Sequence, residues 1–452
     1  MSFPRHARYK ESGVEWLGDI PEHWHVRRLK HVCQVTPSNV DKKSHEGETA
    51  VALCNYTDVY YNDTIVADMN FMPATASDDQ IAKFTLRAGD TIITKDSETA
   101  DDIAVAAYVP NDLPGVVCGY HLSIVRPLAG THGAFVKRFF DSSYAKSCFA
   151  VRANGLTRVG LSQYQIDNVI LPVPPSTEQA LIATFLDCET AKIDALIAEQ
   201  QRLIELLKEK RQAVISHAVT KGLNPNARMK PSGIEWLGDI PEHWAITPLK
   251  WLTDPKRPIM YGIVLPGPDV SEGIPILKGG NVKPSRMNLQ SMARTTPEIE
   301  APYARARLKK GDLVYSIRGS IGDCEPVPTE LEGSNITQDV ARVAVVAGVC
   351  ASWVRWALLS AAVREDLASG SLGAAVRGIN IFDLKRADIP TPPLDEQIAI
   401  ADYVGGENSR IEKLSAGAQH AIDLLRERRA ALISAAVTGQ IDARAFAERK
   451  AA

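Results

Sequence analysis

The chain has 452 residues, more than one hydrophobic core usually supports, so at least two domains are expected. Its 45% apolar and 23% charged residues are typical of a soluble globular protein. The formal net charge of −3 excludes a uniformly basic nucleic-acid-binding protein, although local basic patches would still allow phosphate contacts.

The sequence gives no sign of export or membrane insertion. No apolar stretch is long and clean enough to cross a bilayer, and the N-terminal residues lack the apolar core of a secretory signal. The seven cysteines are odd in number and scattered, which favours reduced thiols over a disulfide framework or a zinc site. We therefore expect a cytoplasmic protein without membrane contact.

A leading segment near the N-terminus is repeated almost unchanged in the second half. Twelve of the thirteen positions of Ser12–Trp24 (SGVEWLGDIPEHW) are identical in Ser232–Trp244, and only Val14 differs, becoming Ile234. A Pro-Pro-x-x-Glu-Gln motif likewise begins at Pro174 and again at Pro392. The chain is thus one unit written twice, which predicts two similar modules about an approximate two-fold axis.

The long stretches between these repeats predict mixed α/β modules. Alternating or β-branched residues indicate short strands at 50–54, 91–94, 116–125, 312–317 and 340–346. A shared Gly-Asp turn, Gly89-Asp90 and Gly311-Asp312, leads into a buried strand in each copy.

The third part of each repeat is helical. After Pro174-Pro175 a short helix is expected to give way to a longer one over about 190–220, and Gly405-Gly406 and Gly417 are expected to weaken the second copy. A heptad written from Ile193 has the same register in both copies, which favours an antiparallel coiled coil of the two helices. The alternative is that each helix buries its stripe against its own module. The residues predicted to pack between the helices are Ile193, Leu196, Leu203, Leu207, Val214, Ile411, Leu414, Leu425 and Leu432.

The predicted fold class is therefore mixed α/β (α+β) modules plus long antiparallel helices, internally duplicated with pseudo-two-fold symmetry. The predicted boundaries are 1–175 for the first module with its leading segment 10–30, 176–222 for the first helical spacer, 223–229 for a linker, 230–393 for the second module with its leading segment 230–250, 394–441 for the second helical spacer and 442–452 for a C-terminal tail.

Signatures of catalysis are missing from the sequence. It contains no G-x-x-x-x-G-K-[ST] phosphate loop, no G-x-G-x-x-G after a strand, and no H-E-x-x-H or cysteine–histidine metal spacing. His23 and His243 recur beside Trp24 and Trp244, where a structural histidine is favoured over a ligand. We expect no catalytic residues and no metal site, and predict a recognition or assembly subunit.

The repeated motifs also carry a family resemblance. The two K-x-S-G-[VI]-E-W-L-G-D-I-P-E-H-W segments (10–24 and 230–244), the two Pro-Pro-x-x-Glu-Gln helix starts and the helix ends at 213–222 and 431–439 occur in the same order in both halves. Together with the stretch LCNYTDVY at 53–60, they resemble the specificity subunit of type I restriction–modification systems. The resemblance spans the chain, although the long middles match only in outline.

This resemblance implies two target-recognition domains, each reading one half of a split double-stranded DNA target, with the helices setting the gap. It implies docking of two methyltransferase (modification) subunits and of motor–nuclease (restriction) subunits in a prokaryotic cytoplasm. S-adenosylmethionine, ATP and Mg²⁺ would belong to those partners, and no cofactor would be bound by this chain.

Side chains that read bases are expected among Arg, Lys, Asn, Gln, Ser and Thr residues on loops. The alternative for each residue is a solvated surface side chain. The candidates in the first module are Asn55, Tyr56, Thr57, Lys95, Ser97, Arg152, Asn154, Thr157 and Arg158, and those in the second are Lys256, Arg257, Tyr261, Lys278, Asn281, Arg318, Ser320, Gln338, Arg377 and Asn380.

Two other functions remain open from the sequence. The chain could guide methylation alone, in an orphan system without a nuclease subunit. It could also be a coiled-coil scaffold with two protein-binding modules, which salt-dependent binding to duplex DNA would exclude.

Overall fold

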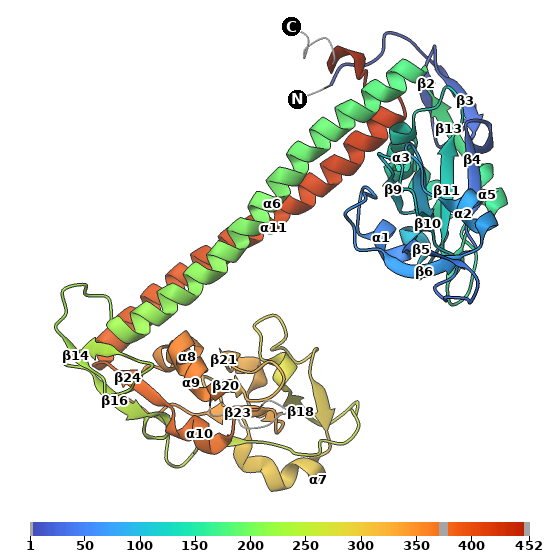
Figure 1. The fold of residues 1–452 in the computed structure, drawn as a ribbon. Helices are drawn as coiled ribbons and strands as arrows, with labels where there is room; N and C mark the ends of the chain where they lie inside the picture. The colour runs from blue at the N-terminus through green and yellow to red at the C-terminus, as the bar shows by residue number, and fades with distance from the viewer. Residues whose placement is uncertain (1–2, 370–377, 447–452) are drawn as a thin grey trace. The chain divides into compact units, whose positions relative to one another are not determined.

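The computed structural model describes residues 3–369 and 378–446. The chain divides into two compact units, Met1–Gln200 with His420–Ala452, and Gln201–Gln419. Each unit holds one module of short strands and helices and a part of two long helices, α6 (Ser176–Lys221) and α11 (Leu394–Val437) (Figure 1). The predicted fold class, mixed α/β modules with long helices in a duplicated chain, is confirmed.

The elements follow a similar order in both modules, although α1, β8 and β12 of the first have no counterpart among the described strands and α-helices of the second. The first contains β1 (Tyr9–Glu11), β2 (Asp19–Pro21), β3 (His25–Arg28), β4 (Cys33–Pro37), β5 (Thr49–Cys54), α1 (Tyr56–Tyr60), β6 (Met72–Ala76), α2 (Asp78–Phe84), β7 (Thr91–Thr94), β8 (Asp96–Ser97), β9 (Ala106–Tyr108), β10 (Val116–Cys118), β11 (Leu122–Pro127), α3 (Gly133–Asp141), α4 (Ser143–Ala150), β12 (Val159–Gly160), α5 (Gln163–Asp167) and β13 (Ile170–Val173). The second contains β14 (Met229–Pro231), β15 (Asp239–Pro241), β16 (Ala245–Pro248), β17 (Met260–Tyr261), β18 (Ile274–Leu277), β19 (Ala293–Thr295), α7 (Pro297–Glu300), β20 (Leu313–Ser316), β21 (Cys324–Pro326), β22 (Asn335–Ile336), β23 (Val340–Val343), α8 (Ala351–Leu359), α9 (Ala361–Ser369), α10 (Ile381–Arg386) and β24 (Asp388–Thr391).

The two modules share one sheet topology although their sequences differ. Each has a four-stranded antiparallel sheet, in the order β4-β11-β7-β9 in the first and β17-β23-β20-β21 in the second. Each also has a three-stranded sheet whose central strand, β5 or β18, has one parallel and one antiparallel neighbour. The duplication visible in the motifs therefore extends through the diverged middles.

The alternation of side chains along a strand explains how one sheet serves two cores. In β7, Ile93 belongs to the core beneath α3 and α4, whereas Ile92 faces the three-stranded sheet. The expected single strand at 116–125 is in fact two strands, because the chain turns at Gly119 between β10 and β11. That turn exposes Tyr120.

The repeated leading segment and the Pro-Pro-x-x-Glu-Gln motif form one contact in each unit, which we call the clip. In the first unit the carboxylate of Glu178 accepts a hydrogen bond from the buried indole Nε1 of Trp24 at 3.1 Å and lies 2.8 Å from Nε2 of His23. The adjacent amide of Gln179 accepts from the backbone N–H of His132 at 2.7 Å, just before α3. Glutamate and glutamine together therefore attach the leading segment and the module to the start of α6.

The second unit repeats the clip. Nε1 of Trp244 lies 2.9 Å and Nε2 of His243 lies 2.6 Å from the carboxylate of Glu396. Gln397 accepts from the backbone N–H of Cys350, before α8, at 2.9 Å. In each unit, the histidine and the tryptophan of the leading segment contact one glutamate of the Pro-Pro-x-x-Glu-Gln motif. This shared contact explains why the two residues recur together.

Both long helices are continuous, which differs from the sequence-based expectation. A single helix, α6, replaces the short and long helices expected after Pro175. Gly405, Gly406 and Gly417 lie inside α11 without interrupting it. A glycine costs about 1 kcal/mol in a helix interior, and packing along the rest of the helix offsets this cost.

Within each unit the parts of α6 and α11 run side by side in opposite directions (Figure 1). Of the residues predicted to pack between them, Ile193, Leu207, Ile411 and Leu432 are buried, and Val214 and Leu425 are half-buried. Leu196, Leu203 and Leu414 lie at the surface instead, between 41% and 51% exposed. Their assignment to the packed stripe was therefore wrong.

The physical reason lies in the first turns of α6. Leu186 and Thr190 are buried, and at about 100° per residue their stripe continues through Ile193 and Ile197 rather than through Leu196. The second stripe position is therefore Ile197 and not Leu196. In α11 the same shift replaces Leu414 by half-buried Ser415.

The corrected register brings two cross-helix ion pairs into equivalent places. Nε of Arg429 in α11 lies 2.9 Å from Asp194 in α6, in the first unit. In the second unit Arg211 of α6 lies 3.9 Å from Glu412 of α11. Asp194 corresponds to Glu412 and Arg211 corresponds to Arg429, because the members of each pair are separated by the same number of residues as the two Pro-Pro-x-x-Glu-Gln motifs. The two ion pairs therefore follow the predicted pseudo-symmetry.

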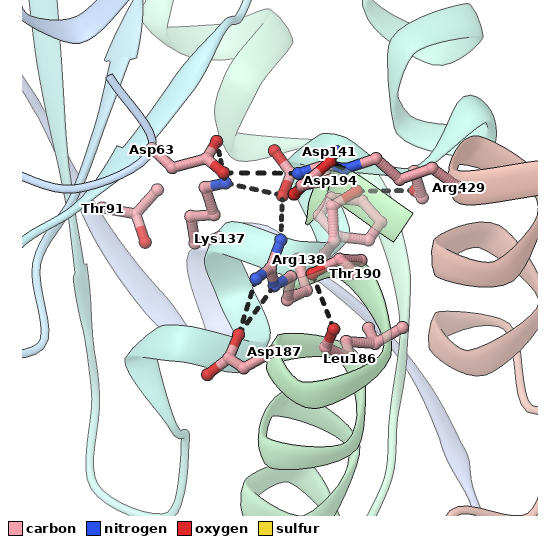
Figure 2. A network of polar contacts seen from close by, with 12 residues as sticks. Asp63, Thr91, Lys137, Arg138, Asp141, Leu186, Asp187, Thr190, Asp194 and Arg429 are labelled. Carbon is pink, nitrogen blue, oxygen red and sulfur yellow. Dashed lines mark hydrogen bonds and ion pairs between the residues drawn. The ribbon is translucent and has the colours of Figure 1, made fainter. Parts of the chain in front are cut away.

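An ionic network joins the first module to its helices (Figure 2). Nζ of Lys137 in α3 lies 2.8 Å from Asp63, and Arg138 lies 2.6 Å from Asp187 in α6. Arg429 reaches the other oxygen of Asp63 at 3.3 Å. Burial alone would raise the pKa of Asp63, but the cations of Lys137 and Arg429 lower it below its ordinary value. The network therefore fixes the module against both helices of its unit.

Among the described residues, no helix combines the length and the apolar character that crossing a membrane would require.

Candidate nucleic-acid interface

The first module brings together polar side chains from four separate segments. Lys95 and Ser97 come directly after β7, and β8 pairs with β12 at the end of the segment 151–158. The backbone N–H of Lys95 donates to the carbonyl of His121, from the turn between β10 and β11. The Ser97 side chain hydrogen-bonds with Tyr56 of α1. Three of the predicted segments and the turn between β10 and β11 therefore meet at one end of the four-stranded sheet, where β7 ends and β11 begins, which we call the sheet edge.

The charges within this cluster are partly paired. Asp96 lies 2.7 Å from Nδ1 of His121 and 3.6 Å from the guanidinium of Arg158. Nζ of Lys95 donates to the carbonyl of Ser38 at 3.0 Å and lies 4.6 Å from the centre of the Tyr120 ring. Burial lowers the pKa of Lys95, although Asp96 opposes this effect. Asp96 therefore holds the His121 ring by a hydrogen bond and attracts the guanidinium of Arg158, which makes no hydrogen bond to it.

Aromatic and amide groups of α1 lie beside these charges. Asn55 precedes α1 as its N-cap, and the rings of Tyr56 and Tyr60 stack with centroids 5.4 Å apart. Burial raises the pKa of Tyr56, while its hydrogen bond with Ser97 lowers it. Thr57 is exposed. The phenol and the threonine hydroxyl can donate or accept, as contacts to base edges require.

The segment 151–158 presents both apolar and basic side chains to solvent. Leu156 is fully exposed, and Asn154, Thr157 and Arg158 are exposed as well. Arg152 differs, because its guanidinium donates back to the carbonyl of Cys148 at 2.5 Å and is half-buried. The segment therefore offers one open guanidinium, that of Arg158, next to the cluster.

The second module has a matching edge with different side chains. Arg318 lies two residues after β20, as Asp96 lies two residues after β7, and its backbone bridges to Gly378. Its side chain is exposed, as is that of Lys278 on the neighbouring loop. A Cβ atom on Gly279 would stand 2.7 Å from the carbonyl oxygen of Arg318, so the close approach of these loops requires glycine there.

Several predicted residues of the second module have contacts within the protein. Arg257 makes two hydrogen bonds of 2.6 Å to the carboxylate of Asp312, the residue of the repeated Gly-Asp turn. The side chain of Asn380 caps α10 by accepting from the N–H of Phe382, and that of Asn281 is held by Lys278 N–H and the carbonyl of Ser291. Ser320 and Gln338 are half-buried, and Lys256 and Tyr261 are exposed. Arg377 lies outside the described residues.

Sequence reasoning did not select Asp96, Tyr120 or His121. Tyr120 and His121 were placed inside a single strand, and only its division at Gly119 brings them to the edge. The glycine was the available signal, because a lone Gly in a strand pattern indicates a turn or a close backbone approach.

The sequence profile described as "Type I restriction modification DNA specificity domain" matches residues 21–207 of this chain. Residues 21–207 therefore resemble a type I restriction–modification DNA specificity domain, and the chain as a whole is similar to specificity subunits of type I restriction–modification systems. The matched residues run from the end of β2 through the rest of the first module and its clip to Leu207 in α6.

Relatives of this family extend the match. The specificity subunit of the Escherichia coli type I restriction enzyme EcoBI is 28% identical over 319 residues, covering 69% of this chain and 67% of that protein. The putative MjaX specificity subunit of Methanocaldococcus jannaschii is 24% identical over 423 residues, covering 91% and 92%.

Solved structures share the fold. A chain from a structure of a type I R-M system, described in terms of complex assembly and conformational transition, superposes with a TM-score of 0.69 at 16% identity, covering 92% of this chain and 98% of that one. The HsdS subunit of Thermoanaerobacter tengcongensis gives a TM-score of 0.56 at 17% identity, covering 95% and 100%.

Proposed function

We propose that this specificity subunit binds a bipartite, asymmetric double-stranded DNA target, with each module reading one half. The observation that carries the proposal is the pair of equivalent sheet edges. The first presents Lys95 and Asp96 before the buried Ser97, where the second presents Arg318 and Gly319 after the buried Ile317. The same scaffold with different side chains at the same place is expected to read two different sequences.

The chemistry of the edges supports base reading as well as phosphate contact. An exposed guanidinium such as that of Arg158 or Arg318 can donate two hydrogen bonds to guanine, and Asn55 is suited to adenine. Lys278 is a point charge that suits phosphate. Half or more of the hydrogen bonds in such interfaces go to phosphate and sugar, so most of the candidates would position the duplex and a few would specify it.

The paired helices are proposed to set the unread gap between the two half-targets. Because an α-helix rises by about 1.5 Å per residue, rigid helices of this kind turn each added residue into a fixed step of length. Half-sites read on one face of a duplex lie about 10 bp apart, or a multiple of that spacing. Equal insertions into α6 and α11 are therefore expected to lengthen the unread gap.

We further propose that the chain itself performs no chemistry. Two methyltransferase subunits would dock on it, and motor–nuclease subunits would join this core. S-adenosylmethionine, ATP and Mg²⁺ would be bound by those partners. The support for this division of labour is the similarity to type I specificity subunits, together with the absence from the sequence of the phosphate-loop and dinucleotide motifs.

The test is binding of the assembled subunit–methyltransferase complex to duplex DNA at several salt concentrations. The proposal expects an affinity that falls steeply with salt and a slope that becomes shallower when Arg158 or Arg318 is replaced by alanine. A complex that binds duplex DNA no better than the methyltransferase subunits alone would overturn it.

A further inference from the structure

We propose that His6, His23 and Glu178 bind one divalent transition-metal ion, with Zn²⁺ as the best match, at the clip of the first repeat. One ligand atom from each of these residues lies within 4.8 Å of the others. Two imidazoles and one carboxylate form a donor set that zinc takes up in proteins, with water at the fourth position.

The distances suit a small tetrahedral ion. Zinc binds histidine nitrogen and carboxylate oxygen at about 2.0–2.2 Å, so neighbouring ligand atoms stand about 3.3 Å apart. Here Nε2 of His23 lies 2.8 Å from one oxygen of Glu178, and Nε2 of His6 lies 3.7 Å from the other. The ligand atoms of the three residues all lie within 4.8 Å of one another. Side-chain movements of up to about 1.5 Å would therefore place them around one ion at zinc–ligand distances.

His6 supplies the independent observation. Its side chain is only 2% exposed, and its Nε2 has no hydrogen-bond partner among the described residues. A buried polar nitrogen without a partner is costly and calls for an explanation such as an ion.

The surroundings provide the outer contacts that metal ligands usually have. The indole Nε1 of Trp24 donates to Glu178 at 3.1 Å and holds that carboxylate in orientation. Nδ1 of His6 lies 3.8 Å from the carboxylate of Asp442, which can accept the Nδ1 proton when Nε2 binds the ion. Nη2 of Arg444 now lies 3.2 Å from Nδ1. Because a guanidinium only donates, metal binding requires Arg444 to yield this contact to Asp442.

The second repeat serves as a natural control. His243 and Glu396 form the same clip, but their side chains are 50% and 38% exposed, against 5% for Glu178. The position that corresponds to His6, by the offset that relates Ser12 to Ser232, is the exposed Asn226. The third ligand therefore exists only in the first copy.

A bound ion would join parts of the first unit that are distant in sequence. His6 precedes β1, His23 lies in the leading segment and Glu178 lies in the first turn of α6. Through Asp442, His6 also connects to the residues that follow α11. The ion would thus clamp the N-terminal segment to both long helices, and its loss would loosen this end of the unit.

The experiment is a Co²⁺ titration of the EDTA-treated full chain, followed by visible absorption, with Zn²⁺ as competitor. The proposal expects one equivalent of Co²⁺ with a tetrahedral spectrum, displacement by Zn²⁺, and a higher unfolding temperature with Zn²⁺ than with EDTA. His6→Ala and His6→Gln should both abolish the one-equivalent phase, and Asp442→Asn should weaken it about 10-fold.

The matched control is His243→Ala, which alters the equivalent clip and should leave the titration unchanged. Circular dichroism of each variant in EDTA checks that it is folded before metal is added. A wild-type chain that takes up no equivalent of Co²⁺, or folded His6 variants that bind it as tightly as the wild type, would overturn the proposal.

Discussion

The indole nitrogen of Trp244 donates a 2.9 Å hydrogen bond to Glu396, a residue 152 positions later in the chain. Trp24 and Glu178 make the same bond at 3.1 Å, 154 positions apart. The leading segment and the helix start are repeated together because each is the other's partner. In both copies the glutamine after the glutamate extends the contact to the module, so the clip joins three parts of the chain.

The two clips should differ in their contribution to stability. Glu178 is buried whereas Glu396 is 38% exposed, so only Glu178→Ala strands the indole N–H of Trp24 away from water. We expect a loss of about 1–3 kcal/mol in the free energy of unfolding for Glu178→Ala, and a smaller loss for Glu396→Ala. Urea denaturation in EDTA measures both, and equal losses would contradict the burial argument.

The cross-helix ion pair in the first unit can be tested by reversing charges. Arg429→Asp should destabilise the chain by about 0.5–1 kcal/mol, since Arg429 is half-buried between Asp194 and Asp63. Adding Asp194→Arg should recover part of the loss. The control is Arg428→Asp, one residue away and exposed, which should have little effect. If Arg428→Asp were more destabilising than Arg429→Asp, the helix register predicted from the sequence would be correct and the register described above would be wrong.

Acid should weaken the second module through Glu300. The guanidinium of Arg307, at 2.6 and 2.8 Å, and Asn335, at 2.7 Å, lower the pKa of this buried carboxyl below its ordinary 4.5, although burial opposes them. Because the pKa of Glu300 is lower in the folded than in the unfolded chain, the ionised carboxylate stabilises the folded chain. This contribution is fully present above pH 4.5 and is lost as the pH falls through the folded-state pKa. Glu300→Gln should therefore cost about 1–3 kcal/mol at pH 7 and flatten the fall in stability below about pH 5. The urea midpoints of the wild type and of Glu300→Gln, measured between pH 7 and the acid range, test this prediction. If the two proteins lose stability with falling pH in the same way, Glu300 is not the group responsible.

Two arginines of the second module should respond in opposite ways. Arg257 is engaged by Asp312, whereas Arg318 is exposed at the sheet edge. Arg257→Ala should lower stability and leave the salt dependence of DNA binding unchanged. Arg318→Ala should leave stability within about 0.5 kcal/mol and weaken binding by about 1–3 kcal/mol if it reads a base. Parallel melting and binding measurements separate the two, and the reverse pattern would exclude Arg318 from the interface.

The sequence predicted what repeats and periods can encode. Duplication indicated the two units, and strand alternation located β5, β7, β20 and β23 to within a few residues. In the predicted apolar stripe of the long helices, every second position was wrong by one residue. Leu196 was chosen in place of Ile197 because both side chains are apolar. Only the burial of the preceding turns of α6 shows which of the two faces the partner helix. Local patterns carry no such tertiary information.

The candidate site was harder to predict for the same reason. Nothing in the sequence distinguishes Arg257 from Arg318. The structure does, because Arg257 is hydrogen-bonded to Asp312, a residue 55 positions away in the chain. The group of His6, His23 and Glu178 has no motif spacing, since two of its members lie near the N-terminus and the third at the start of α6. Contacts of this kind exist only after folding.

The most direct test of the central claim is sequencing of methylated bases in the genome of cells with this gene intact, deleted, or carrying an exchanged second module. A bipartite methylated motif should disappear on deletion, and exchange of the second module should alter one half of the motif while preserving the other. Methylation that is unchanged by deletion, or a continuous motif that changes throughout on exchange, would contradict the account.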